Sequence, residues 1–87
     1  MAHQFIRHAV ADYDKWRVAY DAHESTRQEY GLKQLGVHRG IENPNEITAV
    51  FEIESVERAG EFVASDELKS AMQEAGVQGM PDIWFTD

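Results

Sequence analysis

Apolar residues fall in short clusters along the chain, and their spacing differs from one cluster to the next. The first cluster, residues 2–10, has no helical period and predicts a strand. In residues 13–30 the large side chains recur every three or four positions, which predicts one helix. Asp12 is placed to cap the N-terminus of this helix, and Gly31 to end it in the left-handed conformation.

The middle of the chain predicts a hairpin. Strands are expected over residues 32–41 and 47–53, joined by the turn Glu42-Asn-Pro-Asn-Glu46, because proline and asparagine favour chain reversal. Pairing Ile41 with Ile47 collects the large apolar residues on one face, whereas a one-residue slip would scatter them. The same register places on the opposite face His38, Val50 and Glu52.

The last third of the chain predicts a broken helix and a terminal strand. Ser55 and Ser65 are both good N-caps, and apolar residues follow each of them at helical spacing as far as Gly76. We therefore expect a helix of two pieces over this stretch. The segment from Pro81 to Phe85 predicts a short last strand.

The order of these elements predicts the fold class. Strand, helix, strand, strand, helix, strand favours an α+β, ferredoxin-like βαββαβ fold, a four-stranded antiparallel sheet with the helices on one face. A length of 87 residues allows a single domain spanning residues 1–87. Helices on one face leave the other face of the sheet open, with Val50 on it. An open apolar sheet face favours a symmetric dimer in which two sheets pack together.

The charge of the chain narrows the choice of partners. There are 16 acidic and 8 basic residues, and most of the excess falls in residues 42–67, where Arg58 is the only basic side chain. Because phosphate binding needs a basic surface, we expect no nucleic-acid partner and no membrane partner. The chain has no cysteine, which excludes disulfides and thiol chemistry. It also lacks an apolar run of signal-peptide or membrane-span length, so a cytoplasmic protein is expected.

Two stretches of the sequence resemble a known family. The first is His8-Ala-Val-Ala-Asp-Tyr-Asp-Lys-Trp16, and the second is Ser65-Asp-Glu-Leu-Lys-Ser-Ala-Met-Gln-Glu-Ala-Gly-Val77, followed by Gly79-Met-Pro81. Both are similar to small dimeric α/β-barrel proteins of the antibiotic biosynthesis monooxygenase-like superfamily, in particular its uncharacterised cyclase-like branch. The resemblance covers essentially the whole chain. It implies a homodimer whose two sheets form a barrel, with a pocket between sheet and helices in each subunit.

The resemblance leaves the reaction open. The superfamily includes quinone-forming oxygenases, isomerases, haem-degrading enzymes and proteins without known activity. The sequence has no dinucleotide fingerprint, phosphate loop, GxSxG elbow or HExxH motif, so we expect no bound cofactor. Relatives of the monooxygenase type oxidise activated aromatic substrates without one, using tryptophan, asparagine, tyrosine and arginine in the pocket. Their full set has no match here.

The first candidate site is formed by Trp16, Tyr20 and His23, spaced i, i+4 and i+7 on the buried face of the predicted helix. An aromatic wall that ends in one titratable group suits a flat organic ligand. His23 can serve as a general base, because the ordinary pKa of histidine lies near neutrality. The plainer interpretation is that the two aromatic residues are core and that His23 is a boundary histidine.

His8 is the second catalytic candidate, provided that its face of the first strand points toward the helices. If so it meets His23 across the pocket, and otherwise it is a hydrogen-bonded core histidine. The four histidines show no HxH or i, i+4 pair, so no metal site is expected. Arg39 suits an anionic ligand, and methionine adapts to irregular pocket walls. Further ligand-binding candidates are therefore His38, Arg39, Met72 and Trp84.

Three functional hypotheses follow. The first is a cofactor-independent oxygenase or isomerase that acts on a hydrophobic cyclic organic substrate in a helix–sheet pocket. The second is a non-catalytic small-molecule-binding or accessory module of the same fold, in which the acidic span steers association. The third and weakest is haem or metal handling. Whether the protein is an enzyme stays open at this point, and its expected partners are a second copy of itself and a small hydrophobic ligand.

Overall fold

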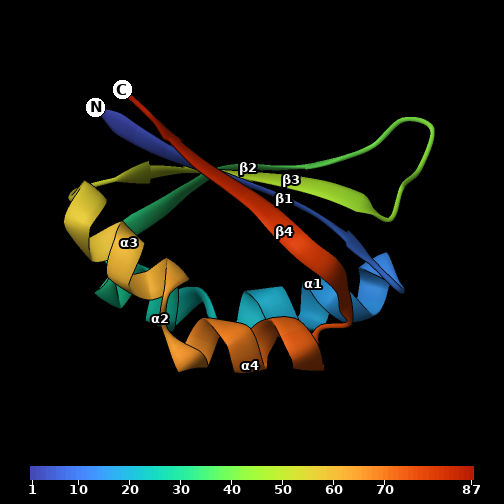
Figure 1. Ribbon diagram of the computed structural model, residues 1–87. Helices are drawn as coiled ribbons and strands as arrows, with labels where there is room; N and C mark the ends of the chain where they lie inside the picture. Colours follow the sequence, from blue (N-terminus) through green and yellow to red (C-terminus); the bar gives the residue numbers. More distant parts are fainter.

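A computed structural model describes all 87 residues of the chain. Its secondary structure follows the predicted order of elements, except that the first helical region is divided as well as the second (Figure 1). The elements are β1 (Ala2–Val10), α1 (Tyr13–Ala22), α2 (Glu24–Glu29), β2 (Leu32–Arg39), β3 (Glu46–Ile53), α3 (Val56–Val63), α4 (Asp66–Glu74) and β4 (Val77–Thr86).

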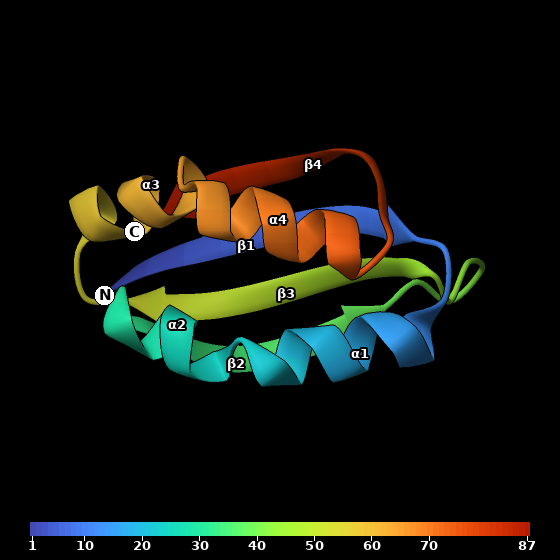
Figure 2. The same cartoon turned by 90° about the horizontal axis from the view of Figure 1, so that it is seen from below.

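The four strands form one antiparallel sheet in the order β2-β3-β1-β4. All helices lie on one face of this sheet (Figure 1). Figure 2 shows them in two rows, with α1 and α2 beside β2 and β3, and with α3 and α4 beside β1 and β4. The predicted ferredoxin-like βαββαβ fold is thereby confirmed. None of the helices has the length and apolar character that crossing a bilayer would require.

The core forms where the two central strands meet the helices. Because side chains alternate along a strand, every second residue of β1 and β3 faces the helices and is buried. Trp16 and Tyr20 cover this surface from α1, and Phe62 covers it from α3. Burying a large apolar side chain of this kind contributes about 1.5–3 kcal/mol to stability.

Serine and aspartate caps begin the helices where the sequence places them. Asp12 accepts a hydrogen bond from the backbone N–H of Lys15, and Ser55 accepts one from Arg58, each at 3.2 Å. Ser65 caps α4 in the same way, so the second helical region is broken as predicted. Gly31 has a φ of 78°, the left-handed conformation expected at the end of the first region.

The first helical region was predicted as one helix, and this is wrong at His23. His23 leaves helical geometry at φ −101° and ψ 13°, and its N–H donates to the carbonyl of Tyr20, which tightens the last turn of α1. The guanidinium of Arg27 also donates to this carbonyl, at 2.8 Å. A side chain from the next helix therefore stabilises the end of α1, which no periodicity in the sequence could indicate.

The hairpin register also differs from the predicted one. Arg39, rather than Ile41, pairs with Ile47, and β2 carries a bulge at Leu35. A shift of two residues preserves the faces, so His38 points away from the helices as predicted. Leu35 and Ile41 do not join the core, because the first lies in the bulge and the second lies in the loop, fully exposed.

The last strand is longer than predicted, since β4 starts at Val77 and runs for ten residues. Gly79 adopts a φ of 69° where the pairing of β1 with β4 shifts register, a place where glycine is favoured. Pro81 is tolerated because β4 is an edge strand of the sheet.

Replacing Trp16 with alanine is expected to lower the free energy of unfolding by about 3–5 kcal/mol, because the indole is 3% exposed and stacks on Tyr20. Chemical denaturation followed by circular dichroism measures this loss. The control is Val18→Ala in the same helix, whose side chain is 73% exposed and whose loss should stay within about 0.5 kcal/mol. Equal losses in the two variants would contradict the packing described here.

Candidate functional site

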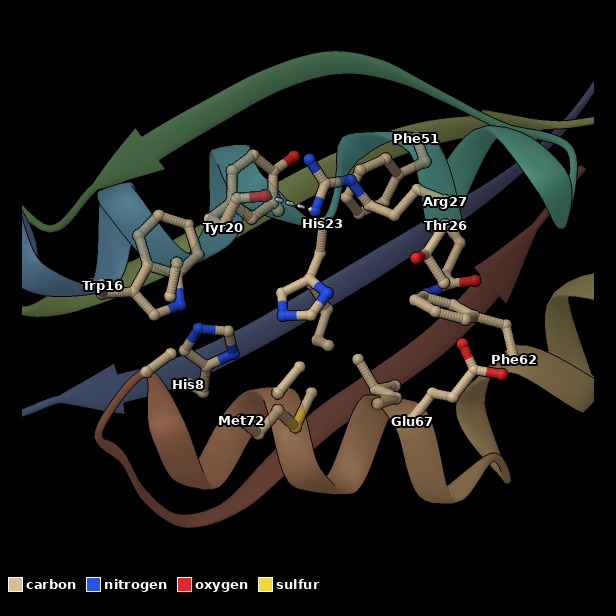
Figure 3. A pocket seen from close by; sticks show the side chains of 17 residues that line it. His8, Trp16, Tyr20, His23, Thr26, Arg27, Phe51, Phe62, Glu67 and Met72 are labelled. Atoms are coloured by element: carbon tan, nitrogen blue, oxygen red, sulfur yellow. Dashed lines mark hydrogen bonds between the residues drawn. The ribbon is translucent and has the colours of Figure 1, made fainter.

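An apolar cavity of about 70 Å³ lies between the sheet and the helices and opens to solvent on one side. Its floor is formed by side chains of β1 and β3, and its walls come from α1, α2, α3 and α4 (Figure 3). The residues that line it are mostly apolar, so the few polar groups among them determine what chemistry the site can perform.

His8 is the most unusual group in this cavity. It lies in the helix-facing row of β1, is 7% exposed, and packs against Trp16 with 5.6 Å between the ring centroids. Neither of its ring nitrogens has a hydrogen-bond partner. A buried polar group without a partner costs about 1–3 kcal/mol. Burial lowers the pKa of His8, so the imidazole is neutral at neutral pH.

Gln4 shows the same pattern two alternations earlier along β1. It is 1% exposed, lies four residues before His8 in the same row of β1, and its Oε1 also lacks a partner. Three buried polar atoms without partners, two on His8 and one on Gln4, therefore stand on the floor of one apolar cavity. Buried polar groups are almost always hydrogen-bonded, so this floor is suited to polar atoms that enter from outside, on a ligand or on water.

A stacked aromatic pair forms the wall beside this floor. The rings of Trp16 and Tyr20 are 4.7 Å apart at an angle of 26°. The Tyr20 hydroxyl donates to Oε1 of Gln34 at 2.7 Å, which fixes the ring in place. Burial raises the pKa of Tyr20, so the phenol stays protonated and acts as a wall rather than as a proton acceptor.

His23 projects into the cavity from the break between α1 and α2 (Figure 3). It is half-buried and lies between the helical rows, across from Met72 of α4. The break thus places a second, more exposed imidazole in the lining of the cavity. The site combines a buried neutral histidine, a more accessible histidine and a flat aromatic wall.

No family model matches the sequence, and no curated protein matches it either. Solved structures do match its fold. A Bordetella bronchiseptica protein assigned to the antibiotic biosynthesis monooxygenases superposes with a TM-score of 0.79 at 15% identity, over 99% of this chain and 94% of that one. The chain has the antibiotic biosynthesis monooxygenase fold.

Two further structures carry the same fold. SnoaB from Streptomyces nogalater, a cofactor-independent oxygenase, superposes with a TM-score of 0.74 at 9% identity, over 99% of this chain and 90% of that one. A Caulobacter crescentus protein, also assigned to the antibiotic biosynthesis monooxygenases, gives 0.72 at 13% identity, over 99% of this chain and 87% of that one. At these identities the likeness establishes the fold alone.

Within the antibiotic biosynthesis monooxygenase fold, the structure brings several predicted site residues to one cavity. These residues are His8, Trp16, Tyr20, His23 and Met72. The face of His8 was open in the sequence because β1 has apolar residues on both sides. In the structure the His8 side chain points toward the helices, where its ring packs against that of Trp16.

Three predicted ligand-binding residues lie elsewhere. His38 and Trp84 are on the opposite face of the sheet, because strand alternation turns them away from the helices. Arg39 ends β2 at the hairpin, where its guanidinium lies 3.8 Å from the ring centroid of Tyr13 and its Nε donates to the carbonyl of Pro44. None of the three lines the helix–sheet cavity.

The sequence reasoning missed other residues of the cavity, namely Gln4, Thr26, Arg27 and Glu67. Gln4 could have been found, because it lies four residues from His8 on the same strand face. Arg27 continues the helical stripe seven residues after Tyr20, but its contact with the end of α1 has no sequence signal. No three of the chain's histidine, aspartate and glutamate side chains are grouped to hold a metal ion.

Replacing His8 with phenylalanine should leave the free energy of unfolding at pH 7.5 unchanged or raise it by about 1 kcal/mol, because the change removes two unpaired nitrogens. The unfolded chain protonates His8 near pH 6.5, whereas the folded protein does so only at lower pH. Proton binding therefore favours the unfolded chain as the pH falls below about 6.5. Above that pH the His8 side chain is mostly neutral in the folded and in the unfolded protein.

Denaturation between pH 5 and pH 8 measures both effects. The wild type should lose stability below about pH 6.5 more steeply than His8→Phe does. The control His38→Phe changes an exposed histidine and should keep the wild-type slope. A His8→Phe protein destabilised by several kcal/mol at pH 7.5 would contradict the account, since it would mean that the imidazole makes bonds that the fold needs.

Proposed function

We propose that the protein is a cofactor-independent enzyme, an oxygenase or isomerase, that removes a proton from a hydrophobic cyclic organic substrate in the helix–sheet cavity. The observation that carries this proposal is the buried imidazole of His8, which has two unpaired nitrogens beside an aromatic wall. The fold that the chain shares with a cofactor-independent oxygenase supports it.

His8 has the properties of a general base. Its lowered pKa keeps it unprotonated at neutral pH, and no protein group competes for its lone pair. A cyclic substrate lying against Trp16 and Tyr20 would present a C–H beside a carbonyl, or a phenolic O–H, to this nitrogen. The unpaired Oε1 of Gln4 lies in the same row and can accept a hydrogen bond from an O–H or N–H group of the substrate.

Proton removal is the step that both reaction types share. In an isomerase the resulting carbanion takes a proton back at another carbon, and His23, the more exposed of the two histidines in the cavity, would deliver it. In an oxygenase the same carbanion reacts with dioxygen. The low polarity of the cavity strengthens the attraction between the carbanion and the protonated histidine. The non-catalytic alternative keeps the same cavity and binds the ligand without this step.

We also propose that the protein is a homodimer joined through the face of the sheet that carries no helix. On this face Phe5 and Trp84 stack with 5.4 Å between ring centroids and an angle of 4°. Trp84 is 42% exposed, and Val50 beside Phe5 is half-buried. A second copy would cover this aromatic patch, and Arg7, which forms ion pairs with Glu46 and Asp82, would border it.

Proton removal is testable with 2-indanone in deuterium oxide, followed by NMR. The wild type should accelerate deuterium incorporation at the carbons beside the carbonyl, and His8→Phe should lose about 10²–10⁴-fold of that acceleration. The control His38→Phe should match the wild type. Binding of 2-indanone without any exchange would reject the enzyme and leave the binding module.

Sedimentation equilibrium at micromolar concentration tests the dimer. The mass should be twice the 9.9 kDa of the chain. Trp84→Glu should shift it toward the single chain, because a charge cannot be buried unpaired in an apolar interface. Val18→Glu changes an exposed site on the helical side and should leave the mass of the dimer unchanged. A wild-type mass of one chain would refute the dimer.

A further inference from the structure

We infer that the ligand of the cavity carries a planar oxyanion, a carboxylate in the simplest case, and that Arg27 binds it. This inference rests on the proposed function, because it assigns the charge of the ligand in the same cavity. The observation behind it is that Arg27 has no acidic partner in a chain with an excess of acidic residues. Acidic residues outnumber basic ones by 16 to 8, yet none of the four ion pairs in the structure includes Arg27, which is 7% exposed.

The chain holds this guanidinium in place without neutralising it. Its Nη1 donates to the carbonyl of Tyr20 at 2.8 Å, and its central carbon lies 3.7 Å from the centroid of the Tyr20 ring. These two contacts orient the planar group. A guanidinium has five N–H donors, and the hydrogen bond to Tyr20 uses one of them. The oriented fork can therefore donate to both oxygens of a carboxylate.

A purely structural role explains only part of this arrangement. A cation at the C-terminal end of α1 is favourable, because the free carbonyls there carry partial negative charge. That accounts for the bond to Tyr20. It does not account for the position of Arg27 along the wall of a cavity whose floor carries two further unpartnered polar groups, His8 and Gln4.

The charged residues around Arg27 do not form an ion pair with it, so its guanidinium can bind an anionic ligand. Asp21 and Glu24 attract it through space but lie beyond ion-pair distance, and Arg17 repels it. Burial lowers the pKa of Arg27, but a guanidinium stays protonated at neutral pH. Glu67 lines the cavity from the other helical row and is exposed, so the mouth carries one negative charge opposite the buried positive one.

The position of Arg27 also predicts how the ligand lies. Figure 3 shows Arg27 and Thr26 toward one end of the cavity and His8 toward the other, with His23 between them. An anionic group bound at Arg27 would direct the ring of the ligand along Tyr20 and Trp16 toward His8. Arg27 would then be the residue that selects the substrate, and His8 the residue that acts on it.

Calorimetric titration with benzoate and benzamide tests the inference, because these two probes share one ring and differ in charge. At pH 7.5 the wild type should bind benzoate about tenfold more tightly than benzamide. Arg27→Gln should remove this preference while keeping its affinity for benzamide within about threefold. Arg17→Gln, which alters a surface ion pair with Asp21, is the control and should keep the preference.

The possible results separate the role of Arg27 in binding an anion from the existence of the ligand site itself. Equal wild-type affinities would overturn the inference and leave the ligand site intact. Binding of neither probe at millimolar concentration would overturn the ligand site and the inference together. Equal loss of both probes in a folded Arg27→Gln protein would assign Arg27 a structural role only. If Arg27→Gln does not fold, Arg27→Lys is tested instead. It keeps the charge but loses the planar fork, so the preference for benzoate over benzamide should fall. An unchanged preference overturns the inference.

Discussion

A polar side chain in the helix-facing row of the central strand β1 is the constraint on which the rest of the site depends. At His8 an apolar residue would extend the hydrophobic core to which Ile47, its pairing partner on β3, belongs. The imidazole instead stands in the core without a hydrogen-bond partner. The helices pack around it through Trp16 and leave a cavity above it. The fold thus accepts a loss of stability at this position, as proteins commonly do at functional sites.

The break between α1 and α2 is a second feature that brings polar groups to the cavity. A continuous helix would carry its stripe past Tyr20 without interruption. The break turns the chain at His23, and the guanidinium of Arg27 returns to the end of α1. One irregularity therefore positions an accessible histidine and a buried cation on the same wall. The three groups lie in order along the cavity, from Arg27 through His23 to His8 (Figure 3).

Most of the fold could be predicted from the sequence because its signals are local. The caps at Asp12, Ser55 and Ser65 lie where the residue types indicate, and alternation in β3 identifies its buried face. The rest depends on contacts between distant segments. Nothing in residues 13–30 indicates the break at His23, and the bulge at Leu35 has no proline or turn motif to mark it.

The candidate site was predictable where it follows helical spacing and not where it depends on the choice of a strand face. Trp16, Tyr20 and His23 share a stripe that the sequence shows directly. His8 was ambiguous, because Phe5 and Ala9 make the other face of β1 apolar as well. The placement of Trp84 failed for the same reason, since a terminal strand with apolar residues on both sides does not show which face meets the helices.

The central claim is that the unpaired imidazole of His8 receives a ligand inside the cavity. Nitrogen-15 NMR of the histidine rings during a titration with phenol tests it most directly, because each ring nitrogen reports its own hydrogen bonding. The account predicts that the signals of His8, and more weakly of His23, shift to a plateau, while those of His3 and His38 on the other face of the sheet do not move. Unchanged His8 signals at saturating phenol would contradict it.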